Sequence, residues 1–248
     1  MTLSTAKTVR ELALELPNAT RVFENLGLDY CCGGAKSLEE ACRAAELPVD
    51  EVLQKLQNAA QATECEPAGD LRSVPLADLI RHIVTTHHKF TREETARIAR
   101  LLDKVCGVHG KNHPELLNLR DIFQGLVEEL TIHLMKEEQV LFPYIVRMEE
   151  AVLQKDPVLP PAFGTVENPV RMMMLEHDSA GEALRAMREA SRGYTVPEDG
   201  CVSYRTLYQA LPGLEADLHR HIHLENNVLF PRAVEIEQAS KARLSRVS

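Results

Sequence analysis

Apolar residues recur every three or four positions along most of this chain, a spacing typical of amphipathic helices. Few stretches alternate strictly between apolar and polar residues, so strands are not expected. In the first 60 residues the helical segments are short and joined by tight turns. Ser37, followed three residues later by Glu40, forms a capping box, and Pro48 opens a further helix. These signals predict a small helical domain.

Four much longer helical patterns follow, over residues 75–105, 114–151, 167–192 and 202–238. Loops rich in proline or glycine separate the later ones. Four long amphipathic helices with modest connections predict an antiparallel bundle. We therefore expect an all-α protein.

A segment rich in polar residues, proline and glycine interrupts the helical pattern between these two parts. Proline and glycine favour turns and loops over helix interiors. The predicted organisation is a small helical domain over 1–63, a linker over 64–74 and a four-helix bundle over 75–240.

The composition excludes several classes of function. The chain has no Trp, and its formal net charge is −9, from 28 basic and 37 acidic residues. Nucleic-acid binding needs a basic footprint, and no Lys/Arg cluster supplies one, so we expect no nucleic acid and no membrane as partner. No apolar run approaches the roughly 20 residues of a membrane span, and the first ten residues lack the apolar core of a signal peptide. A cytoplasmic protein with its six cysteines reduced is predicted.

The second half of the predicted bundle repeats the first. Residues 133–143 read His-Leu-Met-Lys-Glu-Glu-Gln-Val-Leu-Phe-Pro, and residues 221–231 read His-Ile-His-Leu-Glu-Asn-Asn-Val-Leu-Phe-Pro. Each copy has a histidine upstream at nearly equal distance, 133 − 88 = 45 and 221 − 177 = 44. One His-x-x-x-Glu pair alone is usually a surface pair, but matched offsets are hard to obtain from packing. We infer that one helix pair is a copy of the other, and that each proline kinks or ends its helix.

The repeat predicts a site for two metal ions at the centre of the bundle. Residues four apart lie on one face of a helix, so the His and Glu of each copy converge on one point. Ferritin-like bundles build dinuclear sites from inward-pointing residues in the same way. The predicted ligands are His88, His133, Glu137, His177, His221 and Glu225. The pseudo-twofold symmetry gives each ion two histidines, and both glutamates can bridge. Mixed imidazole and carboxylate ligands suit iron, manganese or zinc.

Other polar residues surround these positions. The remaining histidines are expected on the surface or beside the site, without binding metal: His82, His87, His109, His113, His219 and His223. Three carboxylates are candidates to orient imidazole N–H groups or to line an access path: Glu129, Glu176 and Asp178. For each of them a solvated helix face is the alternative.

Two further motifs are typical of a known protein family. Residues 29–34 read Asp-Tyr-Cys-Cys-Gly-Gly, and residues 224–231 read Leu-Glu-Asn-Asn-Val-Leu-Phe-Pro. Together with the two His-x-x-x-Glu units, they give a chain that resembles the hemerythrin-like domain. Over nearly its whole length it resembles the repair-of-iron-centres proteins of the ScdA/YtfE/NorA type, including their ScdA-type N-terminal domain.

The resemblance implies a non-haem centre of two iron ions with oxo and carboxylate bridges, held by the six residues named above. It also implies a cytoplasmic role in recovering iron–sulfur clusters damaged by nitric oxide or peroxide. Damaged iron–sulfur proteins would then be partners, and NO a small-molecule ligand.

Cys31 and Cys32 are predicted to be exchange thiols, mainly because of this resemblance. Adjacent cysteines followed by two glycines fit a flexible turn after a helix. A vicinal disulfide is strained and reducible, which suits exchange of electrons, iron or NO better than stapling. The alternative is a structural turn with incidental thiols.

Three functions share the predicted metal site. The chain is a repair protein that supplies iron to damaged clusters, an enzyme that reduces two NO to N₂O, or a module that binds NO or O₂ without turnover. The symmetric set of four His and two Glu differs from the more His-rich site of hemerythrin oxygen carriers. No catalytic triad or activated nucleophile is evident, so enzyme activity stays open. We expect repair, with NO binding or NO reduction linked to denitrification as the alternative.

Overall fold

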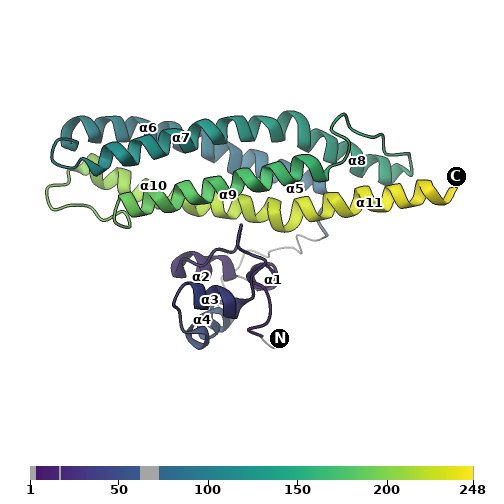
Figure 1. The fold of residues 1–248 in the computed structure, drawn as a ribbon, viewed down its shortest axis with the longest axis horizontal. Helices are drawn as coiled ribbons and strands as arrows, with labels where there is room; N and C mark the ends of the chain where they lie inside the picture. Colours follow the sequence, from purple (N-terminus) through teal and green to yellow (C-terminus); the bar gives the residue numbers. More distant parts are fainter. Residues whose placement is uncertain (1–3, 17, 62–72, 248) are drawn as a thin grey trace.

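The structure, a computed structural model, describes residues 4–16, 18–61 and 73–247 and shows two helical parts (Figure 1). The N-terminal part contains α1 (Val9–Glu15), α2 (Ala19–Leu26), α3 (Leu38–Ala44) and α4 (Val49–Gln61). It lies against the side of a long helical bundle, near the middle of the bundle's length (Figure 1). Most of the predicted linker over 64–74 falls outside the described residues.

Two capping boxes organise the N-terminal part. As the sequence predicts, Ser37 Oγ accepts from the backbone N–H of Glu40 at 3.2 Å, and the Glu40 carboxylate accepts from that of Ser37 at 3.0 Å. Thr8 and Glu11 form the same motif before α1, at 3.2 and 2.8 Å. Apolar side chains from all four helices, Phe23 among them, pack beneath these caps. The caps satisfy helix-end N–H groups that would otherwise lack partners.

The bundle consists of four long helical stretches that run antiparallel (Figure 1). They are α5 (Leu76–His82), η1 (Ile83–His88) and α6 (Lys89–His109); α7 (Glu115–Lys136), η2 (Glu137–Leu141) and α8 (Phe142–Gln154); α9 (Glu167–Ala190); and α10 (Val202–Leu224), η3 (Glu225–Leu229) and α11 (Phe230–Val247). They coincide with the four predicted patterns, so the prediction of an all-α four-helix bundle preceded by a small helical domain is confirmed.

Three of these stretches widen into π-helical turns at the level of the predicted ligands: η1 ends at His88, and η2 and η3 begin at Glu137 and Glu225. After each glutamate, the N–H of the phenylalanine before proline bonds to the glutamate's carbonyl, five residues back. Proline lacks an N–H and its ring clashes with the carbonyl four residues earlier. The wider turn accommodates this, so Pro143 and Pro231 widen their helices rather than end them.

Two apolar clusters fill the bundle on either side of the ligand level. One includes Phe123 and Leu211, and the other includes Ile145 and Phe230, all at most 1% exposed. The buried histidines and glutamates form a polar layer between them. The apolar walls exclude water from this layer, which strengthens every electrostatic interaction inside it.

The N-terminal part docks on the bundle through the loop after α2. Asn227 Nδ2 of η3 donates to the backbone oxygen of Tyr30 at 3.0 Å. The Tyr30 ring packs edge-on against His223 and His219 of α10, at centroid distances of 5.3 and 6.4 Å. This contact holds residues 29–34 against the bundle at the ligand level. His223 is therefore buried beneath the N-terminal part, not on the surface.

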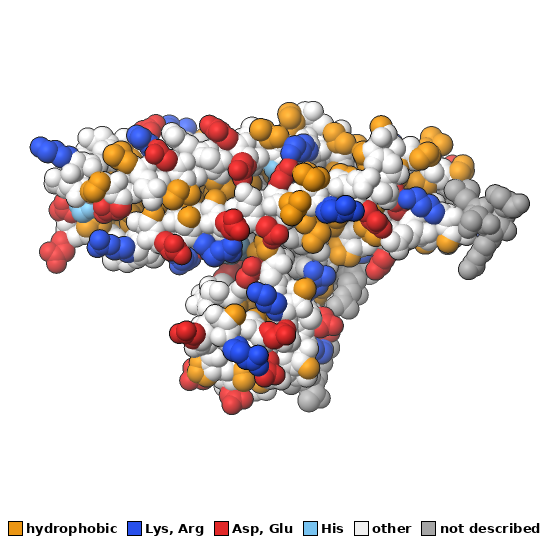
Figure 2. All heavy atoms as spheres, in the orientation of Figure 1, with side chains coloured by type: hydrophobic (Ala, Val, Ile, Leu, Met, Phe, Trp, Pro, Cys, Tyr) orange, Lys and Arg blue, Asp and Glu red, His pale blue; other side chains and the backbone are white. Residues whose placement is uncertain are grey.

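Acidic and basic side chains are mixed over both parts on the face that Figure 2 shows. Hydrophobic side chains are also exposed on the bundle, among them Met172 and Leu175 of α9, at 52% and 55%. Within the described part of the chain, none of the helices has the length and apolar character that crossing a membrane requires.

Candidate metal centre

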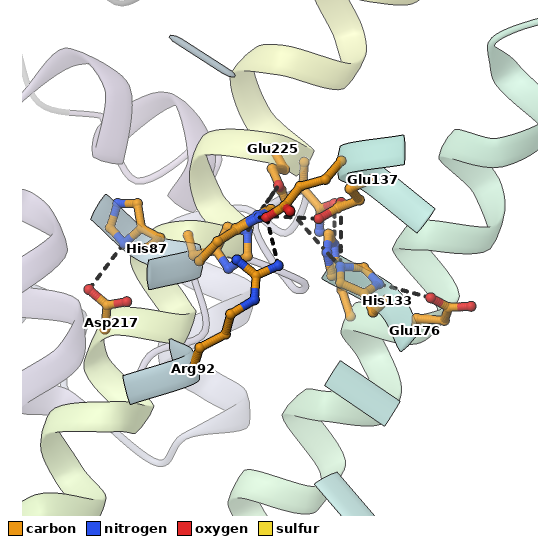
Figure 3. Close-up of polar contacts among 12 residues, drawn as sticks. His87, Arg92, His133, Glu137, Glu176, Asp217 and Glu225 are labelled. Atoms are coloured by element: carbon orange, nitrogen blue, oxygen red, sulfur yellow. Dashed lines mark hydrogen bonds and ion pairs between the residues drawn. The ribbon is translucent and has the colours of Figure 1, made fainter. Parts of the chain in front are cut away.

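The six predicted ligands meet in one buried layer, where each is at most 3% exposed. They are His88 at the end of η1, His133 in α7, Glu137 at the start of η2, His177 in α9, His221 in α10 and Glu225 at the start of η3. Figure 3 shows this layer, with His133 and both glutamates labelled. Every stretch of the bundle contributes at least one of the six.

The six side chains form two groups that share both glutamates. Within each group, one nitrogen or oxygen atom per residue lies within 4.8 Å of the others. We call the group of His88, His221, Glu137 and Glu225 position A, and the group of His133, His177, Glu137 and Glu225 position B. Each position therefore offers two imidazoles and two carboxylates.

The carboxylates reach from one position to the other. Glu137 places Oε2 3.4 Å from Nε2 of His88 and Oε1 3.4 Å from Nε2 of His133. The two oxygens of Glu225 lie 2.9 and 3.2 Å from the Nε2 atoms of His221 and His177. Two ligand atoms at right angles on one ion, each about 2.1 Å from it, are about 3 Å apart. The spacing therefore suits metal ligands, and each glutamate lies close to histidines of both positions.

At position B, the Nε2 atoms of two imidazoles face each other. His133 Nδ1 bonds the Glu176 carboxylate at 2.8 Å, and His177 Nδ1 bonds Asn226 Oδ1 at 2.9 Å. These bonds engage Nδ1 of each ring and leave Nε2 as the atom that faces the glutamates. The two Nε2 atoms lie 3.1 Å apart, the separation expected of two ligand atoms on one ion, so the residues fit a bound metal.

The electrostatics of the layer also favour a bound cation. Neither buried oxygen of Glu137 has a hydrogen-bond partner within residues 4–16, 18–61 and 73–247. Burial raises the pKa of Glu225, but the surrounding histidines, His221 foremost, outweigh burial and hold that pKa well below its usual range. Burial lowers the pKa of His133, while the carboxylates of Glu137 and Glu225 raise it to about 9. An ionised Glu225 in this buried layer requires a cation beside it.

Three side chains orient imidazoles of this layer from outside it. Glu138 accepts from His88 Nδ1 at 2.7 Å and from Arg92 at 2.8 Å. Burial raises the pKa of Glu138, but these two hydrogen bonds outweigh it and hold the pKa below its usual range. Glu176 and Asn226 do the same for the two histidines of position B. Such partners fix the tautomer and orientation of a metal-binding histidine.

The three carboxylates singled out in the sequence lie in different surroundings. Glu176 contacts His133 and Lys136, and its pKa is lowered because these hydrogen bonds outweigh burial. Glu129 accepts from Ser179 at 2.9 Å and lines a hollow of about 10 Å³ beside the layer, room for about one water molecule. Asp178 is exposed, on the solvated helix face that was the alternative.

His87 also points away from the ligand position, as expected, but it is not on the surface. Its side chain is buried, with Nδ1 3.0 Å from Asp217 Oδ1 (Figure 3). Its ring lies parallel to that of His221, at a centroid distance of 5.8 Å and an interplanar angle of 4°. His221 Nδ1 is buried and has no hydrogen-bond partner among the residues that the structure describes. Within that part of the chain, position A therefore has one imidazole that is not oriented through Nδ1.

The two predicted exchange thiols lie directly against the bundle. Cys32 Sγ is 3.6 Å from the backbone oxygen of His177, and 3.9 Å from Cys31 Sγ. Asp29 Oδ1 accepts from both cysteine N–H groups, at 3.1 and 2.9 Å. The hydrogen bond with Cys32 and burial raise the pKa of the Cys31 thiol. A Cβ on Gly34 would lie 2.6 Å from Tyr30 O, so the tight turn requires glycine there.

These thiols border a cleft of about 610 Å³ between the two parts. Its walls include both cysteines, the N-terminal loop and residues of α9 and α10 such as Arg185, Arg188 and His219. Burial lowers the pKa of His219, which keeps that ring neutral at pH 7. The turn that carries the thiols forms part of the wall of this cleft.

Comparison with known proteins decides the family. Residues 79–233 match the hemerythrin HHE cation-binding domain, and residues 5–60 match ScdA_N, a domain of unknown function. The iron-sulfur cluster repair protein YtfE of Escherichia coli is 38% identical over 90% of this chain and 94% of its own length. The chain belongs to the hemerythrin-like iron-sulfur cluster repair family.

Two other members of this family match a similar share of the chain. YtfE of Pectobacterium carotovorum is 36% identical over 92% of this chain and 96% of its own length. A probable iron-sulfur cluster repair protein of Haemophilus influenzae is 34% identical over 90% of this chain and 95% of its own. The resemblance stated from the motifs is thus confirmed, and the bundle of this family member is a cation-binding domain.

Sequence reasoning missed two of the orienting residues in this family member. Glu138 and Asn226 directly follow the two predicted glutamate ligands. The repeat could have found them, because they occupy the same offset in its two copies. Asp217 had no such signal, since its contact with His87 joins residues 130 positions apart.

Proposed function

We propose that this chain holds a pair of iron ions at positions A and B and acts in the repair of iron–sulfur clusters damaged by nitrosative or oxidative stress. The observation that carries the metal pair is the facing Nε2 atoms of His133 and His177, with both glutamates spanning the two positions. The repair role rests on the family, whose members are named as iron-sulfur cluster repair proteins.

The protein's own residues would do three things at this centre. The four histidines and two glutamates would bind the metal, and Glu138, Glu176 and Asn226 would orient three of the histidines. The apolar clusters would keep bulk water away from the layer. Iron held there would supply redox and Lewis-acid chemistry, and it would itself be a cargo that a damaged cluster needs.

We further propose that Cys31 and Cys32 take part in exchange with the client, a damaged iron–sulfur protein in the cytoplasm. Cys32 contacts the backbone of His177, so thiol and metal ligand are neighbours. The cleft beside the thiols admits part of another molecule. In this proposal the region 1–63 is an exchange module tethered through 64–74 to the metal-binding bundle over 75–240.

Metal analysis tests the centre. The purified protein, loaded with Fe²⁺ under anaerobic conditions, should contain about two irons per chain. His133→Leu and Glu225→Leu should lose most of this iron, and Asp178→Asn, an exposed carboxylate next to His177, should keep it. Full occupancy in a His133→Leu, Glu225→Leu double variant would refute the ligand assignment.

A second experiment separates repair from NO chemistry. An iron–sulfur enzyme inactivated by NO is incubated with iron-loaded protein, with metal-free protein, or with loaded Cys31→Ser, Cys32→Ser protein. Repair predicts recovery with the loaded protein only, and weaker recovery without the thiols. N₂O formed over many turnovers, with no recovery of the enzyme, would favour NO reduction; NO uptake without N₂O or recovery would favour a binding module. The names of the relatives favour repair over reduction.

A further inference from the structure

The two metal positions differ in how their histidines are held. Three of the four Nδ1 atoms have an acceptor: Glu138 for His88, Glu176 for His133 and Asn226 for His177. The fourth, His221 Nδ1, is buried and has no acceptor in the described part of the chain. Both histidines of position B are therefore oriented through Nδ1, but only one histidine of position A.

The internal repeat shows why the partner is missing. Glu176 directly precedes His177, and His87 directly precedes His88, so His87 occupies the place in the first copy that Glu176 has in the second. Glu176 reaches across to the histidine of the neighbouring helix. His87 also reaches across, but its ring stacks on His221 and its Nδ1 bonds Asp217 (Figure 3). A stacked imidazole offers His221 Nδ1 no acceptor in the ring plane.

The same difference determines how firmly each pair of rings is held. At position B, both rings are tied through Nδ1, and their Nε2 atoms are held 3.1 Å apart. At position A, the His221 ring contacts Glu225 Oε1 through Nε2 at 2.9 Å, but no described residue bonds its Nδ1. Position A therefore has the less firmly oriented pair of imidazoles.

We propose that position A holds its iron less tightly than position B and is the position from which iron is supplied. The inference rests on the proposed function for the iron pair and its role in supply; the difference between the two positions is argued from the hydrogen bonds. Glu138, Glu176 and Asn226 are positioning residues that act through the histidines. Loss of such a partner typically weakens metal binding by about 10- to 100-fold.

Chelation kinetics test the proposal on the full chain. Protein carrying two Fe²⁺ is mixed anaerobically with an excess of a chromogenic ferrous chelator, and iron release is followed by absorbance. We expect two phases of one iron per chain each, with the first about 10-fold or more faster than the second. A single phase that releases both irons would overturn the proposal.

Two matched variants assign the phases to positions. Glu176→Gln removes the ionised acceptor at His133 and should accelerate the slow phase by about 10- to 100-fold, leaving the fast phase unchanged. Glu138→Gln should accelerate only the fast phase, and the exposed control Asp178→Asn should change neither. A merely structural role for these carboxylates would shift both phases together, and that result contradicts the assignment.

A third variant supplies the missing partner. His87→Glu with Asp217→Asn gives His221 the carboxylate that Glu176 gives His133, without leaving two buried carboxylates side by side. If the double variant binds two irons, its fast phase should slow toward the second phase. An unchanged fast phase in a folded, fully loaded variant counts against position A as its source.

The outcomes separate this inference from the proposed function. Two phases without any cluster repair leave the inequivalent positions intact and remove the repair role. Cluster repair by a protein that releases both irons in one phase would support the repair role and refute the inequivalent positions.

Discussion

Gly34→Ala is expected to loosen the turn that carries the two thiols. The added Cβ would lie 2.6 Å from the backbone oxygen of Tyr30, where ordinary contacts exceed 3.4 Å. That oxygen also accepts the hydrogen bond from Asn227 Nδ2, at 3.0 Å. The turn between Tyr30 and Gly34 must therefore open, and the shift of the Tyr30 oxygen takes one acceptor from the buried Asn227 amide.

The magnitude follows from these two effects. Overpacking a tight site costs about 1–3 kcal/mol, and a buried donor left without a partner costs about 1–3 kcal/mol. Together they lower the stability of the docked turn by about 2–6 kcal/mol. Even the lower value raises the population of the open turn about 30-fold. Cys31, at 4% exposure, should become correspondingly more reactive.

Thiol labelling resolved by mass spectrometry measures this opening at Cys31 and Cys32, and urea titration measures the stability. Iron content should stay at the wild-type level, because all six proposed ligands lie on the bundle. The control is Gly107→Ala in α6, where a Cβ meets no atom within 4 Å; it should gain up to about 1 kcal/mol and leave labelling unchanged. Equal labelling rates for Gly34→Ala and wild type would refute the reasoning.

Four further predictions concern the scaffold and the metal. Glu237→Ala should lower the free energy of unfolding by about 2–5 kcal/mol in urea titration, because the Tyr144 hydroxyl and the Val166 N–H lose their buried acceptor. The control Lys241→Met removes only a half-exposed ion pair and should cost less than about 1 kcal/mol. Burial raises the pKa of Glu237, but hydrogen bonds, that from Lys241 foremost, outweigh burial and lower the pKa. The stabilisation by Glu237 is therefore present above the ordinary carboxyl range and is lost as pH falls through the folded-state pKa. Glu237→Gln should flatten this acid dependence of the free energy of unfolding. Ser37→Ala should cost about 1 kcal/mol through loss of the α3 cap, measured the same way. Removing iron by chelation should lower the melting temperature seen by circular dichroism, because the ions bind only the folded bundle, and an unchanged value would argue against a buried centre.

Much of the scaffold could be read from local patterns. Helical periodicity predicted the four long stretches, and the Ser37–Glu40 capping box predicted the start of α3. Local patterns were less informative about Pro143 and Pro231, because a proline that usually ends or kinks a helix can also be absorbed by a π-helical turn. Which of these happens depends on the packing that holds the helix on either side.

The sequence by itself determined that two copies of one unit present His and Glu at matching positions, because helix geometry turns a spacing of four into a shared face. It also determined the family, through motifs short enough to be read without a fold. Only the tertiary structure decided how the imidazoles are held, because Nδ1 partners such as Glu176 and Asn226 come from other helices, 43 and 49 residues away. The repeat is symmetric in its ligands but not in these partners. The difference between His87 and Glu176 becomes visible only when the helices are packed, and it makes position A unlike position B.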